Sequence, residues 1–273
     1  MNKDIIKANI EVHTIMAASY NQEPHFKPEN RQKVKEKLIE LREASGPKLL
    51  DVGCGTGFII DLAKDLFDEI HGIDVTQAML DQVDISNGNI TLYNSPAETL
   101  PFNDDSFDMA TAYSFIHHVH DYTLVLKEIF RVLKPGAIFY VDLEPNKLFW
   151  QAMSNIENNI NKEKYSDIVL KEINSVLHTD ENVQAQFGIE KEVFNQAEYI
   201  KNILGGIEPY IFRQDSLEIG FSKCEIDFQW FLGQGTVMHR QSFEDSEVIN
   251  NYLKEIRPLS NHLFKYLRFI LVK

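Results

Sequence analysis

Acidic residues and glycines occur at a spacing that suits the binding of a nucleotide-like ligand. Asp51 is followed, in the run KLLDVGCGTGF, by glycines at alternate positions, Gly53, Gly55 and Gly57. Glycine tolerates positive φ and lets a ligand come close to the backbone. Asp74 ends the next apolar run, IHGID, close to the distance at which nucleotide-binding folds place an acid on ribose hydroxyls. The spacing predicts a loop that receives a charged group and a carboxylate that accepts two hydroxyls side by side.

A second group of residues that could take part in catalysis is the run IHHVHD, in which His117, His118 and His120 precede Asp121. Histidine has the unperturbed pKa nearest neutrality, which suits a general base. A metal site is disfavoured, because adjacent side chains on a helical turn face different ways and no Cys or His-x₃-His partner stands nearby. We therefore expect no metal. We interpret His117 or His118 as a base or a substrate contact, with helix capping and packing as the alternative.

These residues need a strand, a turn and a helix in that order to position them. Leu49, Leu50 and Val52 suit a strand buried on both faces, and apolar residues at helical spacing follow over 58–67. This unit opens an α/β domain in which a helix N-terminus faces the ligand. A dinucleotide-binding loop reads G-x-G-x-x-G, and Phe58 occupies the place of its third glycine, which argues against NAD or FAD.

Further segments follow in an order typical of one enzyme family. They are NSPAETLPFNDDSFD (94–108), MATAYSFIHHVHD (109–121) and LKEIFRVLKPGAIFYVDLEP (126–145). With the glycine loop they resemble the class I S-adenosylmethionine (SAM)-dependent methyltransferases (methyltransferase type 11 domain), especially the small-molecule group with the ubiquinone/menaquinone C-methyltransferases. The resemblance covers roughly 47–145. It implies an α/β, Rossmann-like fold with a seven-stranded, mostly parallel sheet, helices on both faces and an antiparallel last strand.

The resemblance also implies SAM as cofactor and S-adenosylhomocysteine as product. The loop backbone would receive the methionyl carboxylate, Asp51 would approach the ammonium group, Asp74 would accept the ribose hydroxyls and Val75 would lie against adenine. Residues at the end of the strand over 107–114 would line the pocket. The predicted cofactor-binding residues are Asp51, Gly53, Cys54, Gly55, Gly57, Asp74, Val75, Ala97, Glu98, Tyr113 and Ser114.

The adenine end departs from the family pattern. Relatives commonly carry an acid before Ala-Glu, and here Pro96 stands in its place, with neither a carboxylate nor an N–H. Ala97 still offers a backbone N–H to the ring. Glu98 could take over the adenine amino group, or water could bridge it to Ser95 or Asn94.

The chain outside the core suggests an enclosure. Residues 1–44 are expected to form a helical lid, broken around Asn21–Pro28, where Tyr20, His25 and Phe26 contact substrate or SAM or pack the loop. Residues 45–145 form the SAM-binding core, and 213–273 complete the sheet with strands over 223–231 and 266–272. The insertion 146–212 is predicted as a helical cap with helices over 148–159, 165–177 and 191–204. Its aromatic residues, together with Met153, line the substrate site or pack on the core: Phe149, Trp150, Phe187.

Composition narrows the choice of partner. The net charge of −14 disfavours a nucleic-acid substrate, because an acidic surface repels phosphates. Two cysteines make no disulfide framework, and with no signal peptide or bilayer-spanning run we expect a cytoplasmic protein without a membrane span. Nothing indicates the oligomeric state.

The sequence therefore predicts a SAM-dependent methyltransferase that acts on a small-molecule acceptor beneath a lid and a cap. Its catalytic candidates are His117, His118, Tyr20 and Glu144, the last at the exit of the fifth strand. Two alternatives remain at this point. One is a methyltransferase for a protein or tRNA, and the other is a non-catalytic SAM-binding or partner-binding module.

Overall fold

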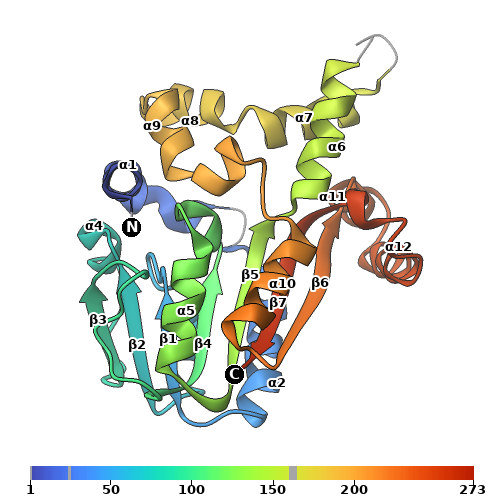
Figure 1. Cartoon of the computed structure of the whole chain (residues 1–273). Helices are drawn as coiled ribbons and strands as arrows, with labels where there is room; N and C mark the ends of the chain where they lie inside the picture. The colour runs from blue at the N-terminus through green and yellow to red at the C-terminus, as the bar shows by residue number, and fades with distance from the viewer. Residues whose placement is uncertain (1, 24–25, 160–164) are drawn as a thin grey trace.

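The computed structural model describes residues 2–23, 26–159 and 165–273, and its centre is a seven-stranded sheet in the order β3-β2-β1-β4-β5-β7-β6 (Figure 1). The strands are β1 (Lys48–Val52), β2 (Glu69–Asp74), β3 (Ile90–Asn94), β4 (Phe107–Tyr113), β5 (Leu133–Pro145), β6 (Lys223–Phe231) and β7 (Phe264–Val272). β1 to β5 pair in parallel, and β7 runs antiparallel to both β5 and β6. The predicted Rossmann-like sheet is confirmed.

Helices cover both faces of the sheet because its central strands are apolar on both sides. Successive side chains of a strand point to opposite faces. Leu49 packs with α2 (Pro28–Glu43) and α3 (Phe58–Ala63), whereas Leu50 packs with α5 (Tyr122–Val132) and α10 (Pro209–Ile219). Figure 1 shows α5 and α10 in front of the sheet and α2 behind it. The layers fix where the strand ends, and hence the site, must lie.

A roof made of two distant segments lies over the carboxyl ends of β1, β2 and β4 (Figure 1). The N-terminal segment contributes α1 (Lys3–Met16) and the 3₁₀-helix η1 (Ala17–Gln22). The cap contributes α8 (Thr179–Phe187), α9 (Lys191–Ala197) and a π-helical turn, η5 (Tyr199–Ile203), whereas its first helices, α6 (Lys147–Asn158) and α7 (Asp167–Leu177), stand above the β5–β6 side of the sheet (Figure 1). Apolar residues of α1, including Val12 and Met16, pack against Phe194 and Ala197 of α9. The lid and the cap thus share one apolar contact.

The cap leaves the sheet and returns to it at one point. The Lys147 N–H donates to the Ile207 carbonyl (2.9 Å), and the Ile207 N–H donates to the Pro145 carbonyl (2.8 Å). Phe212, which the sequence analysis assigns to the cap, lies instead in α10 and is fully buried against the sheet. α10 begins at Pro209 because proline suits the first turn of a helix, where its missing N–H costs nothing.

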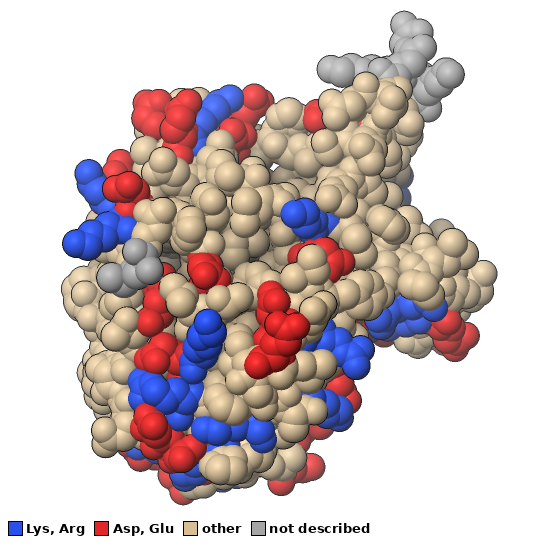
Figure 2. Space-filling view, in the orientation of Figure 1, with Lys and Arg blue, Asp and Glu red and all other residues tan. Residues whose placement is uncertain are grey.

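The last part of the chain joins β6 to β7 through α11 (Gln234–Arg240), α12 (Phe243–Glu255) and η6 (Asn261–Leu263). α4 (Gln77–Leu80) follows β2. Among the described residues we find no helix with the length and apolar character that crossing a bilayer requires. On the face shown in Figure 2, acidic and basic side chains are interspersed over the lower half.

Candidate active site

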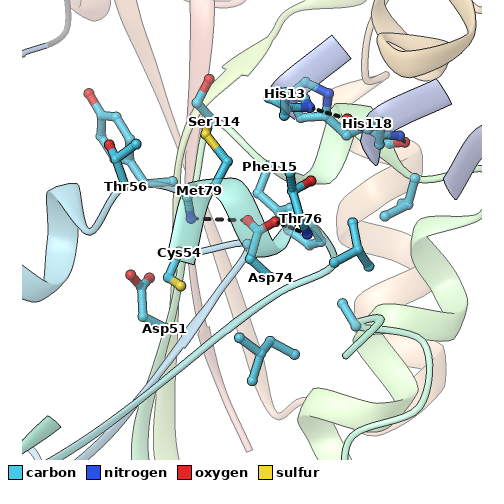
Figure 3. Close-up of a pocket in the computed structure, with 18 of the residues that line it drawn as sticks. His13, Asp51, Cys54, Thr56, Asp74, Thr76, Met79, Ser114, Phe115 and His118 are labelled. Carbon is cyan, nitrogen blue, oxygen red and sulfur yellow. Dashed lines mark hydrogen bonds between the residues drawn. The ribbon is translucent and has the colours of Figure 1, made fainter. Parts of the chain in front are cut away.

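A pocket lies at the carboxyl ends of β1, β2 and β4, beneath the roof. Figure 3 shows Asp51, Cys54 and Asp74 on one side of it and His13 and His118 on another. The strands and following turns supply Asp51, Gly53, Cys54, Gly55, Thr56, Phe58, Ile59, Ile73, Asp74, Val75, Thr76, Met79, Ser95, Ala97, Glu98, Tyr113, Ser114, Phe115, His118 and Val119. The N-terminal segment supplies Ile5, Ile6, Asn9, His13, Tyr20 and Phe26. The structure thus gathers every predicted cofactor-binding residue except Gly57, which lies at the start of α3.

The glycine loop adopts backbone angles that only glycine takes without strain. Gly53 and Gly55 have φ of 66° and 53°. A Cβ on Gly53 would lie 2.0 Å from the Phe115 ring, so the loop also needs the missing side chain. Asp74 braces the loop, because its Oδ2 accepts from the Gly55 N–H (3.0 Å) and its Oδ1 from the Thr76 N–H (2.8 Å). The carboxylate keeps further lone pairs for a ligand.

Asp51 is a buried carboxyl group with one oxygen lacking a partner. Its Oδ1 accepts from the Thr111 hydroxyl (2.7 Å), while its Oδ2 has no hydrogen-bond partner among the described residues. Burial raises the pKa of Asp51 to about 7, since it disfavours the charged form. A buried polar atom left alone is costly, so this oxygen is suited to the ammonium group of a ligand.

We expect the raised pKa to link ligand binding to pH. In the folded protein Asp51 keeps its proton up to about pH 7, whereas in the unfolded chain it loses the proton near pH 4. Its contribution to the stability of the folded protein therefore falls as the pH rises from about 4 to about 7. An ammonium ligand favours the ionised form, so S-adenosylhomocysteine affinity, measured by calorimetry, should weaken below pH 7 by up to about tenfold per unit. Asp51→Asn should bind weakly at every pH. An equally steep profile in Asp51→Asn would contradict this.

Residues on either side of Pro96 border the pocket. Ser95, Ala97 and Glu98 all line it, and the Ser95 N–H donates to the Asp74 carbonyl (3.1 Å). Ala97 is buried and Glu98 is half-buried. Pro96 therefore leaves the segment in place beside Asp74, and Ala97 and Glu98 both border the pocket.

Glu144 holds a turn rather than facing the pocket. It is fully buried, its Oε1 accepts from the N–H groups of Phe115 and Ile116 (2.9 and 2.8 Å), and its Oε2 contacts the N–H and Nδ1 of His117 (3.1 and 2.8 Å). The expectation that it faces the substrate is corrected, because among the described residues its side-chain hydrogen bonds go to η3 (Ile116–His118) and the residue before it, and it does not line the pocket. His117 itself does not line the pocket, whereas His118 does.

The two histidines lie together, contrary to the sequence analysis. Their ring centroids are 4.2 Å apart, because Glu144 holds the Nδ1 of His117 while the Ala197 carbonyl accepts from the Nδ1 of His118 (2.9 Å). Burial opposes a charge on His117, but Glu144 and Glu198 outweigh it and raise its pKa to about 9. Burial, and then the neighbouring His117, lower the pKa of His118. His118 is therefore the neutral one of the pair.

Glu198 is a residue that the sequence analysis missed. It stands between α9 and η5, and its carboxylate lies 3.4 Å from the Nε2 of His117 and 4.0 Å from that of His118. Glu198 and His118 are about 80 residues apart in sequence, and the fold of the cap brings them together. No local sequence pattern predicts this contact. Lys201 donates to its Oε2 (2.8 Å).

Some of the lid residues that line the pocket are those expected from the sequence, and others are not. Tyr20 and Phe26 line the pocket, and burial raises the pKa of Tyr20, which keeps its phenol protonated and makes it a hydrogen-bond donor rather than a base. The predicted contact His25 lies outside the described residues. Asn9 and His13 were missed, although their i, i+4 spacing beside the apolar face of α1 could have indicated them.

The cap aromatics do not reach the pocket. Phe149, Trp150 and Met153 pack with Ile173 and Val176 in a cluster of their own, and Phe187 packs in the contact between α1 and α9. Packing, the alternative interpretation, is therefore the one that the structure supports for these side chains.

Comparison with known proteins agrees with this geometry. Residues 50–141 match a protein-family model described as a methyltransferase domain. A demethylmenaquinone methyltransferase of Staphylococcus aureus (strain JH9) is 39% identical over 107 residues, which are 37% of this chain and 44% of that protein. The chain thus spans less than half the length of that curated relative.

Solved structures extend the similarity to the fold. A putative S-adenosylmethionine-dependent methyltransferase of Listeria monocytogenes gives a TM-score of 0.55 at 13% identity, covering 90% of this chain and 99% of that one. A SAM-dependent methyltransferase of Archaeoglobus fulgidus gives 0.53 at 17% identity, covering 89% and 94%. This chain therefore carries a methyltransferase domain, residues 50–141, within the fold of the class I SAM-dependent methyltransferases.

Proposed function

We propose that this protein transfers the sulfonium methyl of SAM to a small-molecule acceptor held beneath the lid and the cap. The observation that carries the proposal is the buried Asp51 carboxyl, whose Oδ2 has no partner among the described residues, in a pocket that also contains Asp74 and the glycine loop. These groups fit the charged end and the ribose of SAM. The methyltransferase-domain match over the same residues supports the proposal.

Each pocket residue has a role in holding the cofactor. Asp51 pairs with the ammonium group, the N–H groups of the glycine loop and the start of α3 receive the carboxylate, and Asp74 accepts the ribose hydroxyls. Val75 and Ala97 border adenine, with Glu98 at its amino group. When bound, SAM supplies an already activated methyl group, so the protein's task is to position the acceptor and exclude water.

The roof supports a small acceptor. His13 of α1, Tyr20 of η1 and the following Phe26 all line the pocket, which leaves little room for a folded macromolecule at the methyl group. The net charge of −14 also disfavours nucleic acid. That the partly matching relative is a demethylmenaquinone methyltransferase agrees with a small acceptor. We further propose that His118 contacts the acceptor and that the protein works in the cytoplasm, where its two buried cysteines stay reduced.

Methyl transfer from tritiated SAM tests the proposal. The protein is incubated with a panel of phenols and quinols, and separately with bulk tRNA and with cell protein, and label is counted in the extractable and acid-precipitable fractions. We expect label in the extractable fraction, and none with Asp74→Ala. Label that appears only in the precipitable fractions would contradict a small-molecule acceptor. Failure of the wild type to bind SAM by calorimetry would contradict the methyltransferase proposal itself.

A further inference from the structure

We propose that His117, His118 and Glu198 form a binding site for one divalent transition-metal ion, placed so that the ion can hold an oxygen of the acceptor. The inference deepens the proposed function, and only the part about the acceptor rests on it. The three residues lie beside the pocket, since His118 lines it, and they come from η3 and from the cap.

The ligand atoms lie close enough to share one ion. One ligand atom from each residue can be chosen so that all three lie within 4.8 Å of one another. His117 Nε2 is 3.4 Å from Glu198 Oε2, and His118 Nε2 is 4.0 Å from Glu198 Oε1. Nitrogen and oxygen ligands sit about 2.0–2.2 Å from a zinc-like ion, which places two of them about 3–4 Å apart. Shifts of less than about 1 Å would therefore complete the set.

Both imidazoles are held from behind in the way that metal-binding histidines are held. His117 Nδ1 contacts Glu144 Oε2 (2.8 Å), and His118 Nδ1 donates to the Ala197 carbonyl (2.9 Å). A hydrogen bond to the far nitrogen fixes the tautomer and the ring orientation and strengthens the ligand nitrogen. Glu144 is fully buried and has no contact with the pocket, so its place behind His117 accounts for its position.

The arrangement around His118 points to a cation between the side chains. Because Nδ1 of His118 donates to a carbonyl, its Nε2 carries a lone pair, and this lone pair is 4.0 Å from a Glu198 oxygen, which is also an acceptor. Two acceptors that face each other in a buried place need a donor or a cation between them. Lys201 does not fill this position, because it lies against the other oxygen, Oε2.

The charges around the site indicate what the ion would bind. On binding, the ion would displace the proton from Nε2 of His117, which leaves both histidines neutral. A divalent ion and Lys201 then contribute three positive charges, and Glu144 and Glu198 two negative ones, so one positive charge remains. An ionised oxygen of the acceptor, as in a phenol or an enol, would balance it. Two imidazoles with one carboxylate suit Fe²⁺, Co²⁺, Ni²⁺ or Zn²⁺ rather than the oxygen-seeking Mg²⁺ or Ca²⁺.

Cobalt binding to the tag-free, chelator-treated full-length protein tests the site. Co²⁺ is titrated while visible absorption is recorded, and Zn²⁺ is then titrated by calorimetry. We expect saturation at one ion per chain, with displacement of Co²⁺ by Zn²⁺. Loss of a hydrogen bond that supports a metal ligand weakens metal binding by about 10–100-fold. Glu198→Gln keeps the shape of the side chain but removes the charge of a ligand, so it should weaken binding by at least that factor. Lys201→Met should tighten binding, because it removes a competing cation from Glu198.

A matched pair elsewhere in the cap serves as the control. His178 Nε2 lies 2.6 Å from Glu157, a histidine–glutamate pair away from the pocket, so Glu157→Gln should leave the affinity unchanged. Circular dichroism checks each variant's fold, and His118→Gln replaces Glu198→Gln if the latter unfolds. Absence of saturable Co²⁺ and Zn²⁺ binding in the wild type would overturn the site, as would equal affinities in wild type and Glu198→Gln. SAM binding is measured separately, without metal. If SAM binds but the metal does not, the metal site is overturned while the proposed function stands.

Discussion

Replacing Asp74 by alanine is expected to remove nearly all affinity for S-adenosylhomocysteine. The change deletes the acceptor of the Gly55 and Thr76 N–H groups, which orders the glycine loop, and the proposed acceptor of the ribose hydroxyls. Each hydrogen bond to a charged group contributes about 1.5–3 kcal/mol, so losing the two proposed ribose bonds alone corresponds to about a 10²–10⁴-fold weaker Kd. Isothermal titration calorimetry measures the effect.

Asp81→Ala is the control for this experiment. Asp81 lies just after α4, a few residues along the chain, and among the described residues its exposed carboxylate accepts a hydrogen bond from the Gln77 side chain alone (2.8 Å). The affinity of the Asp81→Ala protein for S-adenosylhomocysteine should match that of the wild type. A folded Asp74→Ala protein that binds with less than a tenfold loss would refute the assignment of Asp74 to the ribose.

The second large effect concerns stability rather than binding. Glu144→Ala leaves two buried N–H groups, the part-buried N–H of Phe115 and the imidazolium of His117 without their acceptor. Breaking a buried pair by removing one partner costs about 3–5 kcal/mol, because the other charge stays buried and uncompensated. We expect the free energy of unfolding of the metal-free protein, measured by urea denaturation, to fall by about that amount.

An exposed pair provides the comparison for Glu144. Glu157 and His178 make a similar contact at 2.6 Å, but both side chains are about one-third exposed, at 36% and 35%. Exposed pairs contribute about 0–1 kcal/mol, so Glu157→Ala should change the unfolding free energy by no more than that. Equal losses in Glu144→Ala and Glu157→Ala would show that burial of the turn is not what makes Glu144 important.

The family resemblance predicted the seven-stranded sheet, and local patterns predicted several of its strands and the residues at their ends that line the pocket. The glycine run, the strand that ends at Asp74 and the strand over 223–231 all carry their signal within a few neighbouring residues, and the structure has β6 at those bounds. Pro209 shows how such a signal is overlooked. It begins α10, yet the sequence analysis used it only as the end of the cap, so Phe212 was assigned to the wrong layer.

The acceptor side could not be predicted because tertiary contacts create it. Whether His117 and His118 face the same way depends on Glu144 and on the Ala197 carbonyl, which reach them from β5 and from the cap. The pairing of Glu198 with His118 joins residues that only the folded cap brings together. Glu144 illustrates the same point from the other side: an acid at a strand end indicates a site, but only its neighbours decide whether it faces the ligand or supports the turn.

The common base of the cap has a consequence for how this chain can change. Lys147 and Ile207 are joined by a backbone hydrogen bond, so the two ends of everything between them already meet. A segment with adjacent ends can be lengthened, shortened or exchanged at little entropic cost to the remaining chain, since the closure of its loop does not depend strongly on its length. The cap can therefore be exchanged as a unit while the parallel strands keep their pairing, and because its Ala197 carbonyl contacts His118, each exchange would change the surroundings of that pocket residue.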